Sequence, residues 1–284
     1  MATETSVRAE PALVLENRPG ILETWKIFLV RCHFLSFFSI ALVLTIWHVI
    51  SVYKIFGGTF LPTPWAIVQE IWRLMHQELI GKNLLEHTWA SLHRVFIGWA
   101  IGCAIAIPLG IFMALNDVAR AIVKPVFDLF KPMPPISWIS LAILWFGLGE
   151  ESKVFIIVIG SFVPCLINSF NSLRLVDPAL YDAARMLGAS RRQEIMEVAF
   201  FGILPATFAG LQISLSLAWS CVLAAELVGG RSGIGFLIIL GMNQYKPAII
   251  VAGMVVIALT AWLITVAMDH IEKLVCPWRR DINV

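Results

Sequence analysis

Charged residues are spaced unevenly along the chain, and the gaps between them predict transmembrane helices. Six stretches of 18 to 28 residues contain no Lys, Arg, Asp or Glu: 32–53, 95–116, 132–149, 154–173, 198–225 and 247–268. A helix needs about 20 mainly apolar residues to cross a hydrocarbon core about 30 Å thick. The pattern therefore predicts an all-α polytopic membrane protein, with a six-helix transmembrane domain over residues 32–268.

Composition supports this class. Hydrophobic residues make up 59% of the 284-residue chain and charged residues 14%, whereas soluble domains carry about 25% charged residues. An ordinary soluble enzyme is thereby excluded, and no catalytic residue is predicted. The five cysteines and six histidines show no spacing typical of metal ligands or of a disulfide framework.

The basic residues predict the orientation. Fourteen Lys and Arg fall on segments 1–31, 117–131, 174–197 and 269–284, and seven fall on the segments between the other spans. The positive-inside rule then places both termini in the cytoplasm, as an N-terminal segment 1–31 and a C-terminal tail 269–284. The loop 174–197 is predicted to be cytoplasmic as well.

Two further patterns concern packing. Thr63 and Pro64 are typical of a helix start, and they predict an external amphipathic helix over 64–80, with Ile67 and Leu74 on its apolar face.

In the second span small residues recur every four positions, at Gly98, Gly102, Ala106 and Gly110. Such a stripe permits close helix contact, either with a second copy of the chain or within one chain.

The loop 174–197 contains strong local signals for two short helices. Asp177-Pro178 predicts the start of the first helix, and Gly188 its left-handed stop. Ser190 and Gln193 form a capping-box pattern that starts the second. A DNA-binding helix-turn-helix is disfavoured, because a loop tethered to the membrane at both ends could not easily enter a groove. We therefore expect a docking element for a cytoplasmic partner, and no nucleic acid.

A family resemblance appears in this loop. Asp182-Ala183-Ala184-Arg185-Met186-Leu187-Gly188-Ala189-Ser190 resembles the EAA motif of ABC-importer permeases, with Asp in place of the first Glu. Other segments resemble the nitrate/sulfonate/taurine/bicarbonate branch of these permeases: Leu61-Pro62-Thr63-Pro64, 131–138, 144–150, Ala224-Ala225-Glu226-Leu227, 232–235 and Pro277-Trp278. The similarity runs in order from about residue 60 to the C-terminus.

The resemblance implies a type I importer-like permease in a bacterial inner (plasma) membrane. Its partners would be a second permease copy, which would form a homodimer, two cytoplasmic ATPase subunits and a periplasmic binding protein. ATP and Mg would bind to the ATPase, and the chain has no phosphate-binding loop sequence of its own. The glycine-rich segment 229–235 is interpreted as a turn before a short helix. The docking residues would be Asp182, Ala183, Ala184, Leu187, Gly188, Ala189, Ser190, Arg191 and Arg192.

The cargo implied by the resemblance is a small anion of the taurine/sulfonate, nitrate or bicarbonate type. The same family also admits aromatic carboxylates or another small organic solute. A stand-alone secondary transporter is the alternative from another class, although it leaves the docking loop unexplained.

One position departs from the family pattern. Nine residues after its glycine, the motif usually continues as Ile/Val-x-Leu-Pro. This chain has Val198-Ala199-Phe200-Phe201 there, so that Phe201 replaces the proline, while Pro205 is kept. Because proline breaks helices, its replacement predicts that the second short helix runs on toward the fifth span.

Candidates for the substrate path are the polar positions near breaks and span ends. Lys131 precedes three prolines that must break a helix, and broken helices at membrane depth often line cavities. The alternative for Lys131 is a structural pair with Asp128. Glu226 could pair locally with Arg231 or with Arg94 at an external gate. The candidate set is Lys131, Pro134, Ser137, Trp138, Ser216, Ser220 and Glu226. Most of the polar residues within spans are expected to form interhelical hydrogen bonds, and one or two to face the path; these residues are Asn168, Gln212, Ser214, Ser216 and Ser220.

Overall fold

The computed structural model describes residues 34–54 and 60–278. The chain forms two compact units, 1–57 and 58–284. The predicted segment 1–31 lies outside the described residues, as does the end of the tail 269–284 from residue 279. The first unit contains helix α2 (Phe34–Val52). Every regular element of the described part is helical, which agrees with the predicted all-α class.

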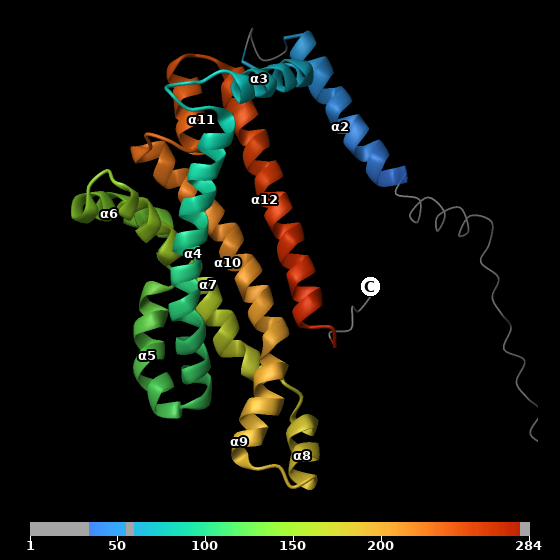
Figure 1. Cartoon of the computed structure of the whole chain (residues 1–284), viewed down its shortest axis with the longest axis vertical. Helices are drawn as coiled ribbons and strands as arrows, with labels where there is room; N and C mark the ends of the chain where they lie inside the picture. Colours follow the sequence, from blue (N-terminus) through green and yellow to red (C-terminus); the bar gives the residue numbers. More distant parts are fainter. Residues whose placement is uncertain (1–33, 55–59, 279–284) are drawn as a thin grey trace, which may run out of the picture. The chain divides into compact units, whose positions relative to one another are not determined.

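The second unit is a bundle of long helices with shorter helices attached at both ends (Figure 1). Its elements are α3 (Pro64–His76), α4 (Leu84–Leu115), α5 (Asp117–Phe130), η1 (Pro135–Trp138), α6 (Ile139–Phe146), α7 (Glu150–Ser172), η2 (Leu173–Leu175), α8 (Pro178–Met186), α9 (Arg191–Gln193), η3 (Glu194–Ala199), α10 (Phe200–Gly229), α11 (Ile234–Asn243) and α12 (Pro247–Val275).

Four of the predicted spans coincide with long apolar helices. Stretches 95–116, 154–173, 198–225 and 247–268 fall in Leu84–Leu115, Glu150–Leu175, Arg191–Gly229 and Pro247–Val275, each long and apolar enough to cross a membrane. The first stretch, 32–53, corresponds to α2, whose described apolar part, Phe37–Val52, is shorter than those four. The described residues therefore hold four membrane-length helices, or five if a bent pair is counted.

The bent pair stands in place of the span expected over 132–149. Asp117–Phe130 and Pro135–Phe146 meet at 83°, because the prolines at 132, 134 and 135 cannot donate the backbone hydrogen bonds that would continue α5. The expectation that these prolines break a helix is confirmed. The boundaries of the span were wrong, since the uncharged stretch contains only its second half.

Helix α7 lies against α4 and α10 and forms the centre of the bundle. The small-residue stripe of α4 faces α7, where Gly98 meets Ile157 and Gly102 meets Ser161. A Cβ atom on Gly102 would lie 2.3 Å from Ser161 Oγ and 2.9 Å from the Val158 carbonyl oxygen. The stripe therefore serves packing within one chain, and the alternative of a dimer face does not hold for these buried positions.

Helix α3 packs on α12 and α4 at one end of the bundle. The Thr63 side chain accepts a hydrogen bond from Ala66 N at 3.2 Å, and Ile67 and Leu74 are buried as expected. The helix ends at His76, four residues before the predicted boundary. The apolar face of α3 is thus buried against α12 and α4.

Polar residues inside the long helices divide into two groups. Gln212 Nε2 donates across to α12, to Asp269 and Glu272 at 2.8 and 2.9 Å, and Trp99 Nε1 donates to Ser214 Oγ at 2.8 Å. Asn168, Ser216 and Ser220 instead donate to carbonyls one turn earlier in their own helices. The expectation that most would bond between helices was wrong, because a short polar side chain can be satisfied on its own helix.

Replacing Gly102 tests the α4–α7 contact. Gly102→Val should lower the free energy of unfolding by about 1–3 kcal/mol, because the added carbons meet the Val158 carbonyl and Ser161. The matched control is Ala104→Val on the exposed face of α4. Thermal unfolding of both purified variants in detergent measures the difference, and equal losses would contradict this packing.

Candidate functional site

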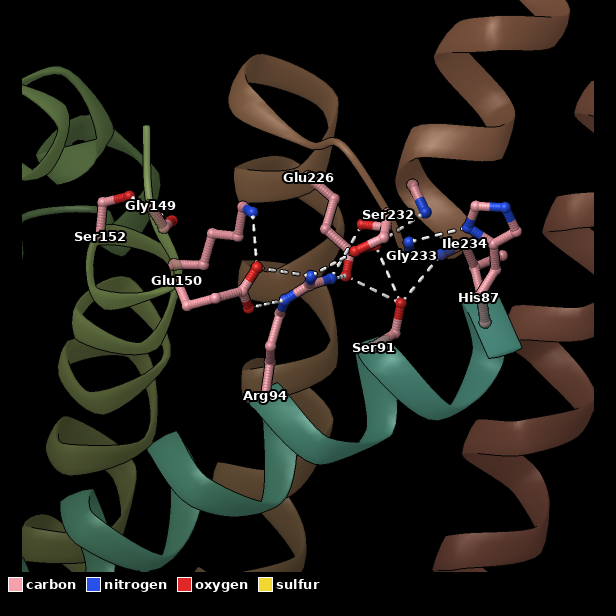
Figure 2. Close-up of polar contacts among 12 residues, drawn as sticks. His87, Ser91, Arg94, Gly149, Glu150, Ser152, Glu226, Ser232, Gly233 and Ile234 are labelled. Carbon is pink, nitrogen blue, oxygen red and sulfur yellow. Dashed lines mark hydrogen bonds and ion pairs between the residues drawn. The ribbon is translucent and has the colours of Figure 1, made fainter. Parts of the chain in front are cut away.

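A buried ionic network joins four elements at the end of the bundle where α3 and α11 lie (Figures 1 and 2). The guanidinium of Arg94, on α4, binds both carboxylate oxygens of Glu150, at the start of α7; Nη2 lies 2.8 Å from Oε1. Its Nη1 lies 2.6 Å from Glu226 Oε1 on α10. Arg94 also donates to the carbonyl and hydroxyl oxygens of Ser232 at 2.9 and 2.7 Å. One side chain thus holds three helices and a turn.

The carboxylate of Glu226 is satisfied from a second side. Ser91 Oγ lies 2.8 and 2.9 Å from its two oxygens, and Gly235 N donates to Oε2 at 2.9 Å. The same Ser91 hydroxyl accepts from Ile234 N, while Gly233 N donates to His87 Nδ1 at 3.1 Å. These bonds use the backbone donors at the start of α11, which otherwise lack partners in a helix.

Gly233 is required by this arrangement. Its φ is +114°, and a Cβ atom there would lie 2.2 Å from a carboxylate oxygen of Glu226. The glycine-rich segment 229–235 is therefore a tight turn into a short helix, as expected, and it wraps around a buried carboxylate.

Burial differs between the two ion pairs. The side chains of Arg94 and Glu226 are 4% and 1% exposed, whereas that of Glu150 is 59% exposed. A buried charge without a partner is very costly, so the inner pair is stable only while its hydrogen bonds are complete. Of the two partners considered for Glu226, the structure selects Arg94. Sequence reasoning missed Ser91, His87 and Glu150, although Glu150 does stand at the edge of an uncharged stretch.

The loop 174–197 folds at the opposite end as its caps predict. Asp177 accepts from Ala179 N at 2.9 Å at the start of α8, and Gly188 has φ +79° at its end. Ser190 and Gln193 form both bonds of the capping box before α9. Glu194 joins the two helices, because it accepts from Arg185 Nε at 2.9 Å and Arg191 Nη1 at 3.2 Å. The same contact raises the pKa of the Arg185 guanidinium.

The tip of this loop is apolar and exposed. Met186 and Leu187 are each 88% exposed. Around them the exposed residues include Asp182, Ala183, Gly188, Ser190, Arg191 and Arg192, while Ala184 and Ala189 are half-buried. The residues predicted to dock a partner thus lie around this exposed apolar tip, together with charged neighbours.

The second short helix continues directly into the span that follows it. One helix runs from Arg191 to Gly229 over 39 residues, with a single π-helical stretch at Glu194–Ala199. The prediction from Phe201 is confirmed. The second half of the loop is therefore continuous with α10 as one helix.

The remaining path candidates lie in separate places. Lys131 Nζ is 3.7 Å from Asp128 Oδ1, so the structural pair considered for it is present. Lys131 and Trp138 line one cavity at the proline break, where Ser137 Oγ donates to the Pro134 carbonyl at 2.5 Å. Ser216 and Ser220 line another cavity of about 240 Å³ between α10 and α12. Glu226 belongs to the ionic network.

Comparison with known proteins decides the family. Residues 106–281 match the family described as "Binding-protein-dependent transport system inner membrane component". The chain belongs to this family.

Curated relatives match this permease over most of its length. It is 30% identical to the taurine transport system permease protein TauC of Escherichia coli (strain K12), over 91% of this chain and 94% of that protein. It is 31% identical to the putative aliphatic sulfonates transport permease protein SsuC of Bacillus subtilis (strain 168), over 85% and 86%. The bicarbonate transport system permease protein CmpB of Synechococcus elongatus is also 31% identical, over 87% and 93%. The chain is accordingly a non-catalytic translocation subunit.

The fold of the permease is that of a solved transporter. A chain of the MetNI methionine ABC transporter, in an inward-facing conformation, matches with a TM-score of 0.58 and 20% identity. The match covers 68% of the permease and 95% of that chain. The predicted type I importer-like fold is thereby confirmed.

The inner pair of the permease network can be tested by removing one charge. Arg94→Gln leaves the buried Glu226 without its ionic partner and should lower the free energy of unfolding by about 3–5 kcal/mol. Arg73→Gln is the control, because it breaks the more exposed pair with Glu70 and should cost about 1 kcal/mol or less. Chemical unfolding in detergent measures both. A loss at Arg94 no larger than that at Arg73 would show that the network is not a structural centre.

Proposed function

We propose that the chain is the permease subunit of an ATP-driven importer in a bacterial inner membrane. It passes a small anion of the taurine/sulfonate, nitrate or bicarbonate type from a periplasmic binding protein to the cytoplasm. The relatives named for taurine, aliphatic sulfonates and bicarbonate support the taurine/sulfonate and bicarbonate part of this range. The basic residues on 117–131 and 174–197 support an orientation with the docking loop inside.

The observation that carries the proposal is the exposed apolar tip of the loop 174–197. Met186 and Leu187 are almost fully exposed on a segment whose two helices are capped and joined through Glu194. An apolar pair held rigidly away from the bundle is the type of feature that becomes buried in a partner. The acidic Asp182 and the basic Arg191 and Arg192 form a charged rim that can fix the orientation of an ATPase subunit.

The continuous helix from Arg191 to Gly229 supports a mechanical coupling. Glu226 lies 35 residues beyond Arg191, which corresponds to about 50 Å of helix at 1.5 Å per residue. Movement of an ATPase against the loop would therefore displace α10 as one body. At its far end this helix is fixed through Glu226, and we assign the Arg94 network to the external gate.

The complete importer would contain two copies of this permease and two ATPase subunits, which bind ATP and Mg. A binding protein delivers the anion at the end where α3 and α11 lie. The path would run past the proline break, with Lys131, Pro134, Ser137 and Trp138, and along the Ser216–Ser220 face of α10. Transport then depends on two conformations of the permease, whose equilibrium is shifted by the ATPase subunits at one end and by the binding protein at the other.

Leu187 provides the test of docking. Leu187→Asp places a charge at the centre of the proposed contact and should reduce co-purification of the ATPase subunit by about tenfold or more. Since Leu187 is 88% exposed, the free permease should fold and insert normally. Leu187→Met is the matched control and should retain the complex.

The measurements are ATPase recovery on the purified permease and uptake of labelled taurine, sulfonate and bicarbonate in cells. Complex formation and uptake that persist in Leu187→Asp would overturn the docking assignment. A wild-type chain that never associates with an ATP-hydrolysing subunit would overturn the importer function itself.

A further inference from the structure

A cavity of about 290 Å³ lies at the proline break between α5, η1 and α7. Five aromatic side chains contribute to its lining: Phe127, Phe130, Trp138, Phe155 and Phe162. Two of the ring contacts around it are Phe127 with Phe162 and Phe130 with Trp138, both with centroids 6.5 Å apart. Lys131 is the charged residue of the lining. The cavity therefore combines a large apolar surface with one ammonium group.

The charge at its rim is unbalanced. Lys124 Nζ pairs with Asp128 Oδ2, and Lys131 Nζ lies 3.7 Å from the other oxygen of the same carboxylate. Two cations share one anion, and the nearer contact belongs to Lys124. One net positive charge thus remains beside the cavity, on a Lys131 side chain that is 48% exposed. An incoming anion can neutralise it without breaking an existing short ion pair.

The backbone at the break offers little to a small inorganic anion. Within segment 131–135 the three prolines have no N–H, and the N–H groups of Lys131 and Met133 donate to the carbonyls of Phe127 and Phe130. Nitrate or bicarbonate would exchange its water shell for aromatic rings and a single ammonium group. The free energy of that transfer is unfavourable, because most of the lost hydrogen bonds are not replaced. An anion that carries its own apolar body would gain by burying that body here.

We propose that this cavity is a selectivity site for organic anions. A sulfonate or carboxylate group would meet Lys131, while an aromatic or branched apolar body lies among Phe127, Phe155 and Phe162. The inference rests on the proposed transport function and narrows it: the permease itself discriminates between organic and inorganic anions. Selection would then not be left to the binding protein alone.

Direct binding to the assembled importer tests the site. The probe is naphthalene-2-sulfonate, whose fluorescence is followed with the permease–ATPase complex in nanodiscs of phosphatidylcholine, a lipid without net charge. Benzenesulfonate should displace the probe, and equal concentrations of nitrate or bicarbonate should not. Displacement by the inorganic anions at equal concentration would overturn the proposed selectivity.

Variants around Asp128 distinguish an effect of local charge on probe binding from an effect of misfolding. Lys131→Gln should weaken probe binding by about fivefold, and Asp128→Asn, which increases the local positive charge, should strengthen it by about twofold or more. Val158→Phe, which fills the cavity from α7, should abolish binding. Arg120→Gln on the same helix, paired with Asp117, is the matched control and should leave binding unchanged. Affinities that are the same in all four variants would overturn the site.

Two further outcomes distinguish the possible failures. If anionic phosphatidylglycerol in the nanodisc displaces the probe as benzenesulfonate does, the cavity is a lipid site and the proposal is wrong. If the ATPase binds and uptake proceeds while naphthalene-2-sulfonate never binds, the selectivity site fails and the importer function stands. If the wild-type chain never associates with an ATPase subunit, the proposed importer function is wrong, which the co-purification experiment with Leu187→Asp and wild type already measures.

Discussion

The pairing of Arg94 with Glu226 is the constraint on which one end of the bundle depends. Both side chains are almost fully buried, and a buried charge is tolerated only when opposite charge and hydrogen bonds surround it. Ser91, Ser232, Gly235 and the outer Glu150 supply those partners from four different elements. The positions of α4, α7, α10 and the start of α11 are therefore mutually determined, because none can shift without exposing an unsatisfied charge.

The opposite end of α10 is organised differently. There the helix runs without interruption into a capped loop whose apolar tip is exposed, and the loop is held by the ion pairs around Glu194 and by Val176 against Gly202. A helix held by a buried network at one end and attached to a protruding surface at the other can transmit displacement along its axis. Between these ends, the glycines of α4 allow close contact with α7, which keeps the centre rigid. The broken helix α5–α6 adds the aromatic cavity beside this rigid centre.

Much of the fold could be predicted because its signals are local. Uncharged length identified four long helices, and the capping residues Asp177, Gly188 and Ser190 predicted both helices of the loop. For the stretch 132–149 the boundaries of the span were wrong, because uncharged length measures hydrophobicity alone, while the adjacent prolines redirect the chain by 83°. The polar residues of the spans were also misjudged in part, since Asn168, Ser216 and Ser220 found acceptors on their own helices.

By itself, the sequence determined the membrane class, the main helices, the two short helices of the loop 174–197 and its family motif, because each arises from residues that are close along the chain. The tertiary structure alone decided how distant charges combine. Arg94 and Glu226 are separated by 132 positions and stand at the edges of uncharged stretches, where a charged residue ordinarily marks contact with water. Only the packing of α4 and α10 against α7 removes them from water and makes them partners. The cavity near Lys131 likewise depends on tertiary structure, because its lining combines rings from α5 and α7.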